Sequence, residues 1–274
     1  MRAVTSKAPQ SRSTVVTFLG AVVRPLGGWM PIAGAVDLLG EVGIDGPSVR
    51  TAVFRLKKNG WLESTSQNGA RGYALTGEAD ATLAAGDEVI WHARRPADLA
   101  DGWCIVHFGV PESMRAKRHQ LRAHLSHLGF GNAGTALWIA PARMRSAAER
   151  AIAELDLAAY AAIFVGGYHG PQDLTDLLYG AWDLAAIDQG YRDFLDDYAP
   201  REEELVALRR GEAFAAYLQL VDAWRKLPFR DPGLPREVLD PQWSAPDATA
   251  LFERLVGKLE KPALKHARTY WPTA

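Results

Sequence analysis

"GPSVRTAVFRLKKNGWLESTSQNGARGYALT", residues 46–76, is the stretch that decides the fold. Asp45 precedes it as a plausible helix cap, Pro47 suits a first helical turn, and Gly60 suits the end of the helix. Apolar residues recur at the helical spacing of 3, 4 and 7, at Val49, Ala52, Val53 and Leu56. We therefore expect a helix over residues 44–60 whose apolar stripe faces the core.

A β-hairpin is expected directly after this helix. Two short strand-like runs flank Asn68-Gly69, a dipeptide typical of tight hairpin turns. Two further helices are expected upstream, over residues 14–25 with Thr14 as a cap, and over residues 31–43. Three helices followed by a hairpin is the order of a winged helix-turn-helix, whose third helix meets the phosphates and base edges of DNA.

Positive charge is concentrated on the same part of the chain. Residues 1–76 carry a formal charge of +5, whereas the remaining residues carry −6 and the whole chain −1. This asymmetry favours an anion-binding module, the alternative being cations scattered over the surface. We expect base contacts from Arg50, Thr51 and Arg55 and phosphate contacts from Lys57, Lys58 and Arg71, with Ser48 on the same face.

The composition restricts the class of protein. A single cysteine, Cys104, excludes an internal disulfide and is expected to be a buried thiol within an apolar run. No apolar stretch reaches the ~18 residues of a membrane span. The amino-terminal residues lack the apolar core of a signal peptide. We therefore expect a cytoplasmic protein that does not bind membranes.

The pattern changes twice beyond the hairpin. After a helix and a linker, strands alternate with helices, which indicates a small ferredoxin-like α+β domain; the remainder is helical. The expected fold class is multidomain α+β. The expected segments are a flexible basic tail (1–13), a winged-helix domain with a trailing helix (14–90), a linker (91–102), a ferredoxin-like domain (103–170) and a helical carboxyl-terminal domain (171–274).

Two motifs resemble functional sites but are interpreted structurally. "GFGNAG", residues 129–134, matches G-x-G-x-x-G but follows a helix and precedes a strand, the reverse of a dinucleotide-binding fingerprint, so we expect a loop. His119, His124 and His127 lie on one expected helix without any acid, which favours a solvated basic face over a metal site. No catalytic residue, metal ion or cofactor is predicted.

Aromatic residues in the last third of the chain raise the question of a small-molecule effector. A cavity for an apolar or aromatic ligand is one interpretation, and an aromatic-rich helical core is the other, which the sequence by itself favours. If the cavity exists, its expected lining is Tyr168, Trp182, Tyr191 and Trp224, with Arg192 and Arg225 supplying anion contacts.

Six motifs occur in an order that resembles one family. They are "RPLGGW", "SVRTAVFRLKKNGWL", "WCIVHFGVPE", "HLGFGNAGTALWIAPA", "AWDLAAIDQGYRDFL" and "RDPGLPREVLDPQWSAPDATALFERL". Together they are similar to the PaaX family of bacterial transcriptional regulators, from about residue 14 to 260. The winged-helix part alone would be a weak match, whereas its combination with the last motif is specific.

The resemblance implies a homodimeric repressor with a winged helix, a middle domain similar to a CRISPR-associated nuclease, and a carboxyl-terminal helical domain. It implies that phenylacetyl-CoA releases the repressor from its operator. It also carries over four recognition-helix positions, namely Arg50, Thr51, Arg55 and Lys58. The hairpin departs from many relatives because Arg71 is its one basic residue. Phe54 stands where relatives often have a small residue, and it either contacts a thymine methyl or packs into the domain.

Two alternatives remain open at this level. The same repressor would respond to a different acyl-CoA or to a free acid if the effector differs. A metal-dependent nuclease would use the middle domain, where Glu112 is the one acid near the end of the first strand and no carboxylate pair is evident. The expected function is therefore that of a regulator and not of an enzyme.

Overall fold

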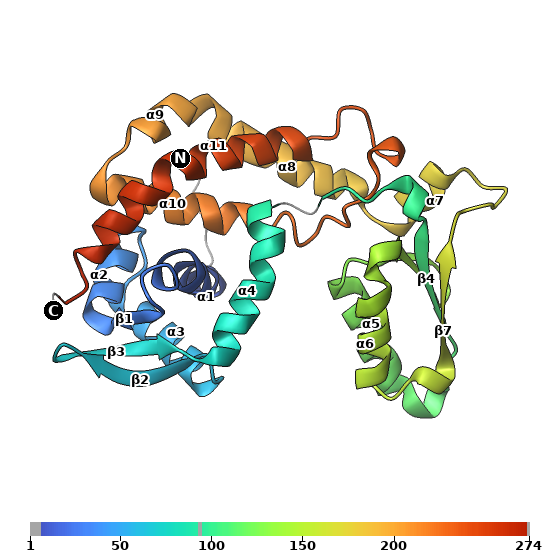
Figure 1. The fold of residues 1–274 in the computed structure, drawn as a ribbon, viewed down its shortest axis with the longest axis horizontal. Helices are drawn as coiled ribbons and strands as arrows, with labels where there is room; N and C mark the ends of the chain where they lie inside the picture. The colour runs from blue at the N-terminus through green and yellow to red at the C-terminus, as the bar shows by residue number, and fades with distance from the viewer. Residues whose placement is uncertain (1–6, 93–94, 273–274) are drawn as a thin grey trace. The chain divides into compact units, whose positions relative to one another are not determined.

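The computed structural model describes residues 7–92 and 95–272, which form two compact units (Figure 1). The first unit consists of the described parts of Met1–Trp91, Asp193–Lys226 and Asp247–Ala274, and the second of His92–Arg192 and Leu227–Pro246. The segments expected from the sequence follow the chain in order, whereas these units do not. The helices after residue 171 are shared between the two units.

The amino-terminal part of the first unit has the expected three helices and hairpin. Its helices are α1 (Lys7–Phe18), which continues into a π-helix (Leu19–Val23), α2 (Ile32–Glu41), α3 (Gly46–Lys58) and α4 (Gly77–His92). Its strands are β1 (Trp29–Pro31), β2 (Leu62–Gln67) and β3 (Ala70–Leu75). They form an antiparallel sheet in the order β1-β3-β2. This is the winged-helix arrangement.

Carboxyl-terminal helices complete the first unit. They are the last turns of α8 (Leu184–Tyr198), then α9 (Glu202–Ala207), α10 (Arg210–Trp224) and α11 (Ala245–Arg268). Helix α10 packs directly against α1, where Phe214 meets Phe18 edge to face. The helical carboxyl-terminal part expected from the sequence therefore supports the winged helix.

A buried carboxylate contacts the middle of the first helix, which begins earlier than expected. Asp222 of α10 accepts hydrogen bonds from the Thr14 hydroxyl at 3.3 Å and the Thr17 hydroxyl at 2.6 Å. Thr14 is thus a buried residue inside α1 and not a helix cap. Helix α1 starts at Lys7, within the segment expected to be a flexible tail (1–13), and residues 1–6 lie outside the described part.

The second unit contains the expected ferredoxin-like domain. Its elements are β4 (Trp103–Phe108), α5 (Arg115–His127), β5 (Gly131–Gly134), β6 (Leu137–Pro141), α6 (Arg145–Glu154) and β7 (Ala161–Gly166), followed by α7 (Leu174–Ala181). The sheet is antiparallel, in the order β5-β6-β4-β7. This strand order and the βαββαβ chain order confirm the fold class.

The two faces of this sheet are covered differently. Helices α5 and α6 lie side by side on one face (Figure 1), where Leu121, Leu125 and Ile152 pack against the inward residues of β4. Cys104 is fully buried there, and burial raises the pKa of its thiol to about 11. On the other face, Trp103 packs with residues of α7 and of the 227–246 segment.

The glycine-rich stretch expected to be a loop contains the edge strand β5. Gly131 is required there because an added Cβ would lie 2.5 Å from the ring of Trp182. Short 3₁₀ helices connect the larger elements at Leu99–Asp101, Glu112–Met114, Ala142–Met144, Ala158–Tyr160, Ala199–Arg201 and Arg236–Val238. Within the described ranges, no helix has the length and apolar character needed to cross a bilayer.

Candidate nucleic-acid interface

Helix α3 is fixed at both ends by the residues that its sequence predicts. The Asp45 carboxylate accepts hydrogen bonds from the backbone N–H and from the hydroxyl of Ser48, both at 2.9 Å. Gly60 adopts a φ of 76°, the left-handed conformation that ends a helix. The Ser48 hydroxyl thus donates within the cap, and its expected role in binding DNA stays a prediction.

The outward face of α3 carries cations that have no counter-ion among the described residues. Arg50, Arg55, Lys57 and Lys58 are all exposed, and within the described residues none of them has an ion pair. By contrast, Arg24 of the same unit binds Asp80 at 2.7 Å and Asp87 at 2.6 Å. The four cations of α3 are therefore free to meet an external anion, as a recognition helix requires.

The hairpin beside α3 has the geometry of a wing. Helix α3 packs against β2, and the β2–β3 turn has positive φ at both central residues, 48° at Asn68 and 76° at Gly69. That combination is typical of a type I′ turn, which confirms the expected hairpin. Arg71 is exposed on β3 opposite Ser66, and it has no ion pair among the described residues.

The last turns of the chain form hydrogen bonds with α2 and β1 of the winged helix. His266 Nε2 lies 2.9 Å from a Glu41 carboxylate oxygen, and the Tyr270 hydroxyl donates to Glu41 at 2.8 Å. The Trp271 indole N–H donates to the Trp29 carbonyl oxygen at 2.8 Å. No local sequence pattern predicts this support, because the partners are 225 or more residues apart.

Two of the residues expected to bind an effector are part of the packing of the first unit. The Trp224 ring is 1% exposed, stacks on Phe252 at 4.4 Å, and donates its indole N–H to the Ile90 carbonyl oxygen at 2.7 Å. The Arg225 guanidinium donates to Asp222 at 3.3 Å and to the Ser13 hydroxyl at 2.7 Å. Both side chains are thus engaged within the protein.

The other four expected effector residues are engaged within the second unit. Trp182 donates to the Gly129 carbonyl oxygen at 3.1 Å, and the buried Tyr191 donates to Asp231 at 3.0 Å. Arg192 pairs with Asp188 at 2.6 Å, and Tyr168 donates to the Gln172 carbonyl oxygen at 2.8 Å. These contacts favour the aromatic-core interpretation over a cavity lined by all six residues.

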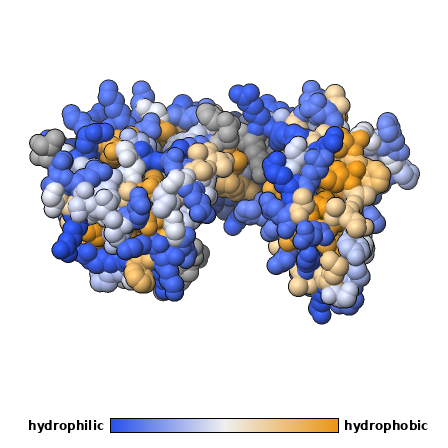
Figure 2. Space-filling view, turned by 60° about the horizontal axis from the view of Figure 1, so that its bottom comes forward, coloured by the Kyte–Doolittle hydropathy of each residue, from blue (hydrophilic) through white to orange (hydrophobic). Residues whose placement is uncertain are grey.

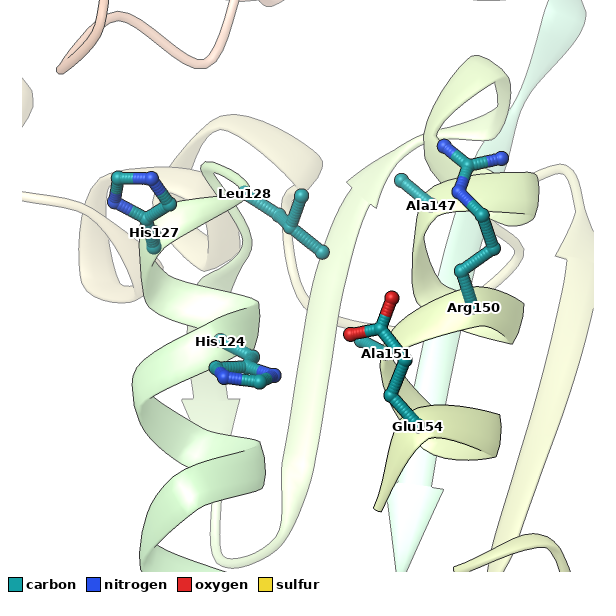
Figure 3. Close-up of a pocket in the computed structure, with 7 residues that line it drawn as sticks. All are labelled: His124, His127, Leu128, Ala147, Arg150, Ala151 and Glu154. Atoms are coloured by element: carbon teal, nitrogen blue, oxygen red, sulfur yellow. The ribbon is translucent and has the colours of Figure 1, made fainter. Parts of the chain in front are cut away.

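None of the six lines any of three hollows in the described surface. Two hollows belong to the first unit, beside Arg24 and beside Arg254. The third, of about 250 Å³, lies between α5 and α6 of the second unit. Figure 3 shows that His124 and the Glu154 carboxylate point into this gap, whereas Arg150 extends towards the turn that carries Ala147. Leu128, Ala147 and Ala151 also line it, so this hollow combines basic groups, one acid and a small apolar surface.

The acid on which a nuclease would depend is occupied by arginines. Glu112 accepts a hydrogen bond from Arg118 at 2.7 Å and lies 3.9 Å from the Arg115 Nε. In the part of the chain that the structure describes, no three His, Cys, Asp or Glu residues are grouped so that they would hold a metal ion. The geometry of Glu112 therefore gives no support to the nuclease alternative.

Comparison with known proteins connects this arrangement to a family. Successive family models match residues 10–79 (PaaX-like protein), 96–178 (PaaX protein central Cas2-like domain) and 182–269 (PaaX-like protein C-terminal domain). The transcriptional repressor PaaX of Escherichia coli (strain K12) is 25% identical over 272 residues, which cover 96% of this chain and 84% of the relative.

The solved structure of the uncharacterized protein Rv0674 from Mycobacterium tuberculosis has a similar fold. It superposes with a TM-score of 0.62 at 20% sequence identity, over 93% of this chain and 98% of that one. At this identity the likeness concerns the fold alone. The three family models together span most of the chain, and the chain therefore belongs to the PaaX-like family of transcriptional regulators.

Proposed function

We propose that the protein is a cytoplasmic repressor that binds a palindromic operator as a homodimer and releases it on binding an aryl-CoA such as phenylacetyl-CoA. The observation that carries the DNA-binding part is the row of cations on α3, the third helix of a winged helix, which have no ion pair in the described part of the chain. The family membership supports the regulatory role.

The contacts divide by chemistry along α3. Arg50 and Arg55 present forked donors suited to guanine acceptors, and Thr51 lies between them on the exposed side. Lys57 and Lys58 near the end of the helix and Arg71 on the wing are assigned to phosphates, where charge is needed more than geometry. In a dimer, two such helices would enter successive major grooves about 34 Å apart.

Strand β7 supplies the surface that we assign to the homodimer. It is an edge strand paired only with β4, and no charged residue occurs between Asp156 and His169. Phe164 is 62% exposed and Val165 is 48% exposed on it. Figure 2 shows apolar surface on this unit. An uncharged apolar edge is the kind of strand that pairs with a second chain.

Light scattering after size-exclusion chromatography tests this assignment. Phe164→Glu should give a monomer that binds a half-site but loses most of its affinity for the palindrome. Phe229→Glu is the matched control, since Phe229 is 41% exposed and lies outside β7. If the Phe164→Glu variant is still a dimer, the dimer interface does not depend on β7.

The effector class follows from the family resemblance and from the chemistry of one hollow. A CoA thioester carries phosphates, so its site needs cations beside apolar surface. The hollow between α5 and α6 is lined by Arg150, His124 and His127, by Leu128 and two alanines, and by Glu154 as the one acid. We propose this hollow for the phosphate-bearing part of the ligand.

Fluorescence anisotropy against the upstream promoter duplex, with a scrambled duplex beside it, tests the whole proposal. Phenylacetyl-CoA should release the specific complex, whereas phenylacetate or CoA alone should not. Arg150→Ala should raise the thioester concentration needed for release without changing DNA affinity. Release by phenylacetate alone would replace the thioester by a free acid, and equal binding to both duplexes would refute the DNA-binding role.

A further inference from the structure

Phe54 is the most exposed large apolar side chain among the described residues, at 65% of its surface. The sequence leaves two roles open for it, contact with a thymine methyl or packing into the domain, and this exposure excludes packing. A single exposed apolar residue is ordinary on a protein surface. The position of Phe54 on α3 is what makes it informative.

Successive residues of a helix are rotated by about 100° around its axis. On this spacing Phe54 lies opposite the buried stripe of α3, at the centre of the outward face. Arg50 and Lys57 lie on one side of it, and Thr51, Arg55 and Lys58 lie on the other. The face is therefore an apolar centre bounded by cations.

A partner that fits this face must carry negative charge at its margins and an apolar group between them. The major groove of DNA has this arrangement, because phosphates form its rims and the thymine 5-methyl is the apolar group on its floor. We propose that Phe54 is a specificity-determining residue that packs against thymine 5-methyl groups in the operator. The inference rests on the DNA-binding function proposed above.

Uracil tests the inference because it differs from thymine only by that methyl. The full chain is first used to select its preferred duplex from a randomised pool. Each thymine of that duplex is then replaced by deoxyuridine, one at a time, and dissociation constants are measured by anisotropy at fixed salt. Loss of one buried methyl group should weaken binding by the wild type about fourfold at one or more positions.

The variants assign the effect to the residue. Phe54→Ala should bind the thymine and uracil duplexes equally, and Phe54→Leu should retain part of the discrimination. Thr82→Ser is the matched control, since it removes an exposed side-chain methyl outside α3 and keeps the hydroxyl. It should discriminate as the wild type does, and circular dichroism should show that all variants fold.

Three results would overturn the inference. If the Phe54→Ala variant still distinguishes the thymine duplex from the uracil duplex, another residue must make the methyl contact. A wild type indifferent to uracil at every position, combined with weaker binding by Phe54→Ala, would make Phe54 a wedge between bases. Failure to select any preferred duplex would refute the inference together with the DNA-binding function, whereas the first two results leave that function standing.

Discussion

Helices α3 and α5 have the same length and the same number of Lys and Arg residues, but their cations differ in how they are paired. Each has 13 residues and four Lys or Arg. On α5, Arg118 binds Glu112 at 2.7 Å and Lys117 lies 3.5 Å from Asp156. On α3, no cation has an ion pair within the described ranges. Three of the four cations of α5 are thus paired within the protein, with Arg122 as the exception, so among the described residues α3 is the better candidate for binding DNA.

Loss of a cation from the two helices should have unequal effects on DNA binding. Arg55→Ala should weaken specific binding by about 1–3 kcal/mol if Arg55 reads a base. Arg118→Ala is the control, because Arg118 is already paired within the second unit. Anisotropy titrations of both variants on the same duplex measure the difference. Equal losses would end the distinction between α3 and α5.

Arg225 and Lys226 resemble the cations of α5, since both pair with the buried Asp222. Burial opposes ionisation of Asp222, but the hydrogen bond from Thr17 and the charges of Lys226 and Arg225 outweigh it and lower its pKa. A lowered pKa stabilises the fold above the unfolded value of about 3.9, and this stabilisation is lost as pH falls through the folded pKa.

Thr17→Val should therefore lower the free energy of unfolding by about 1–3 kcal/mol at pH 7 and by less at pH 3. Urea unfolding at the two pH values measures this. Thr82→Val, in which the lost hydroxyl is exposed on α4 and bonds only a helix carbonyl, should change the free energy of unfolding by less than about 0.5 kcal/mol. A loss for Thr17→Val that is independent of pH would contradict the role of Asp222.

The salt dependence of DNA binding separates the lysines of the two helices. Lys58→Ala should reduce the slope of log affinity against log salt by about 1, on specific and scrambled duplexes alike, because one phosphate contact is lost. Lys117→Ala on α5 should leave the slope unchanged. A reduced slope for Lys117→Ala would indicate that the second unit also makes a phosphate contact.

Removal of a counter-ion from α5 tests the same contrast in the opposite direction. Glu112→Gln removes the charge that pairs with Arg115 and Arg118. Because Glu112 and Arg115 are exposed and Arg118 is half-buried, the free energy of unfolding should change by no more than about 1 kcal/mol. Affinity for scrambled DNA at low salt should rise slightly. Unchanged affinity would show that free cations on this helix are not sufficient for binding.

Much of the first unit could be predicted because its signals are local. The cap at Asp45, the stop at Gly60 and the turn at Asn68-Gly69 depend on residues within a few positions of one another. The ferredoxin-like order followed from the alternation of strands and helices. The aromatic effector residues could not be judged this way, because an apolar repeat looks the same whether it lines a cavity or fills a core.

The sequence by itself determined the winged helix, the ferredoxin-like domain and the face of α3 on which Phe54 lies, since helical rotation and turn conformations are set by neighbouring residues. Only the tertiary structure decided which charges are free. The acids that pair with Arg24 are 56 and 63 residues away, and the hydroxyl partners of Asp222 are 205 or more residues away. A counter-ion can come from a residue that is distant in sequence. Whether a cation of α3 has an ion pair is therefore known only when the positions of the acids in the folded chain are known.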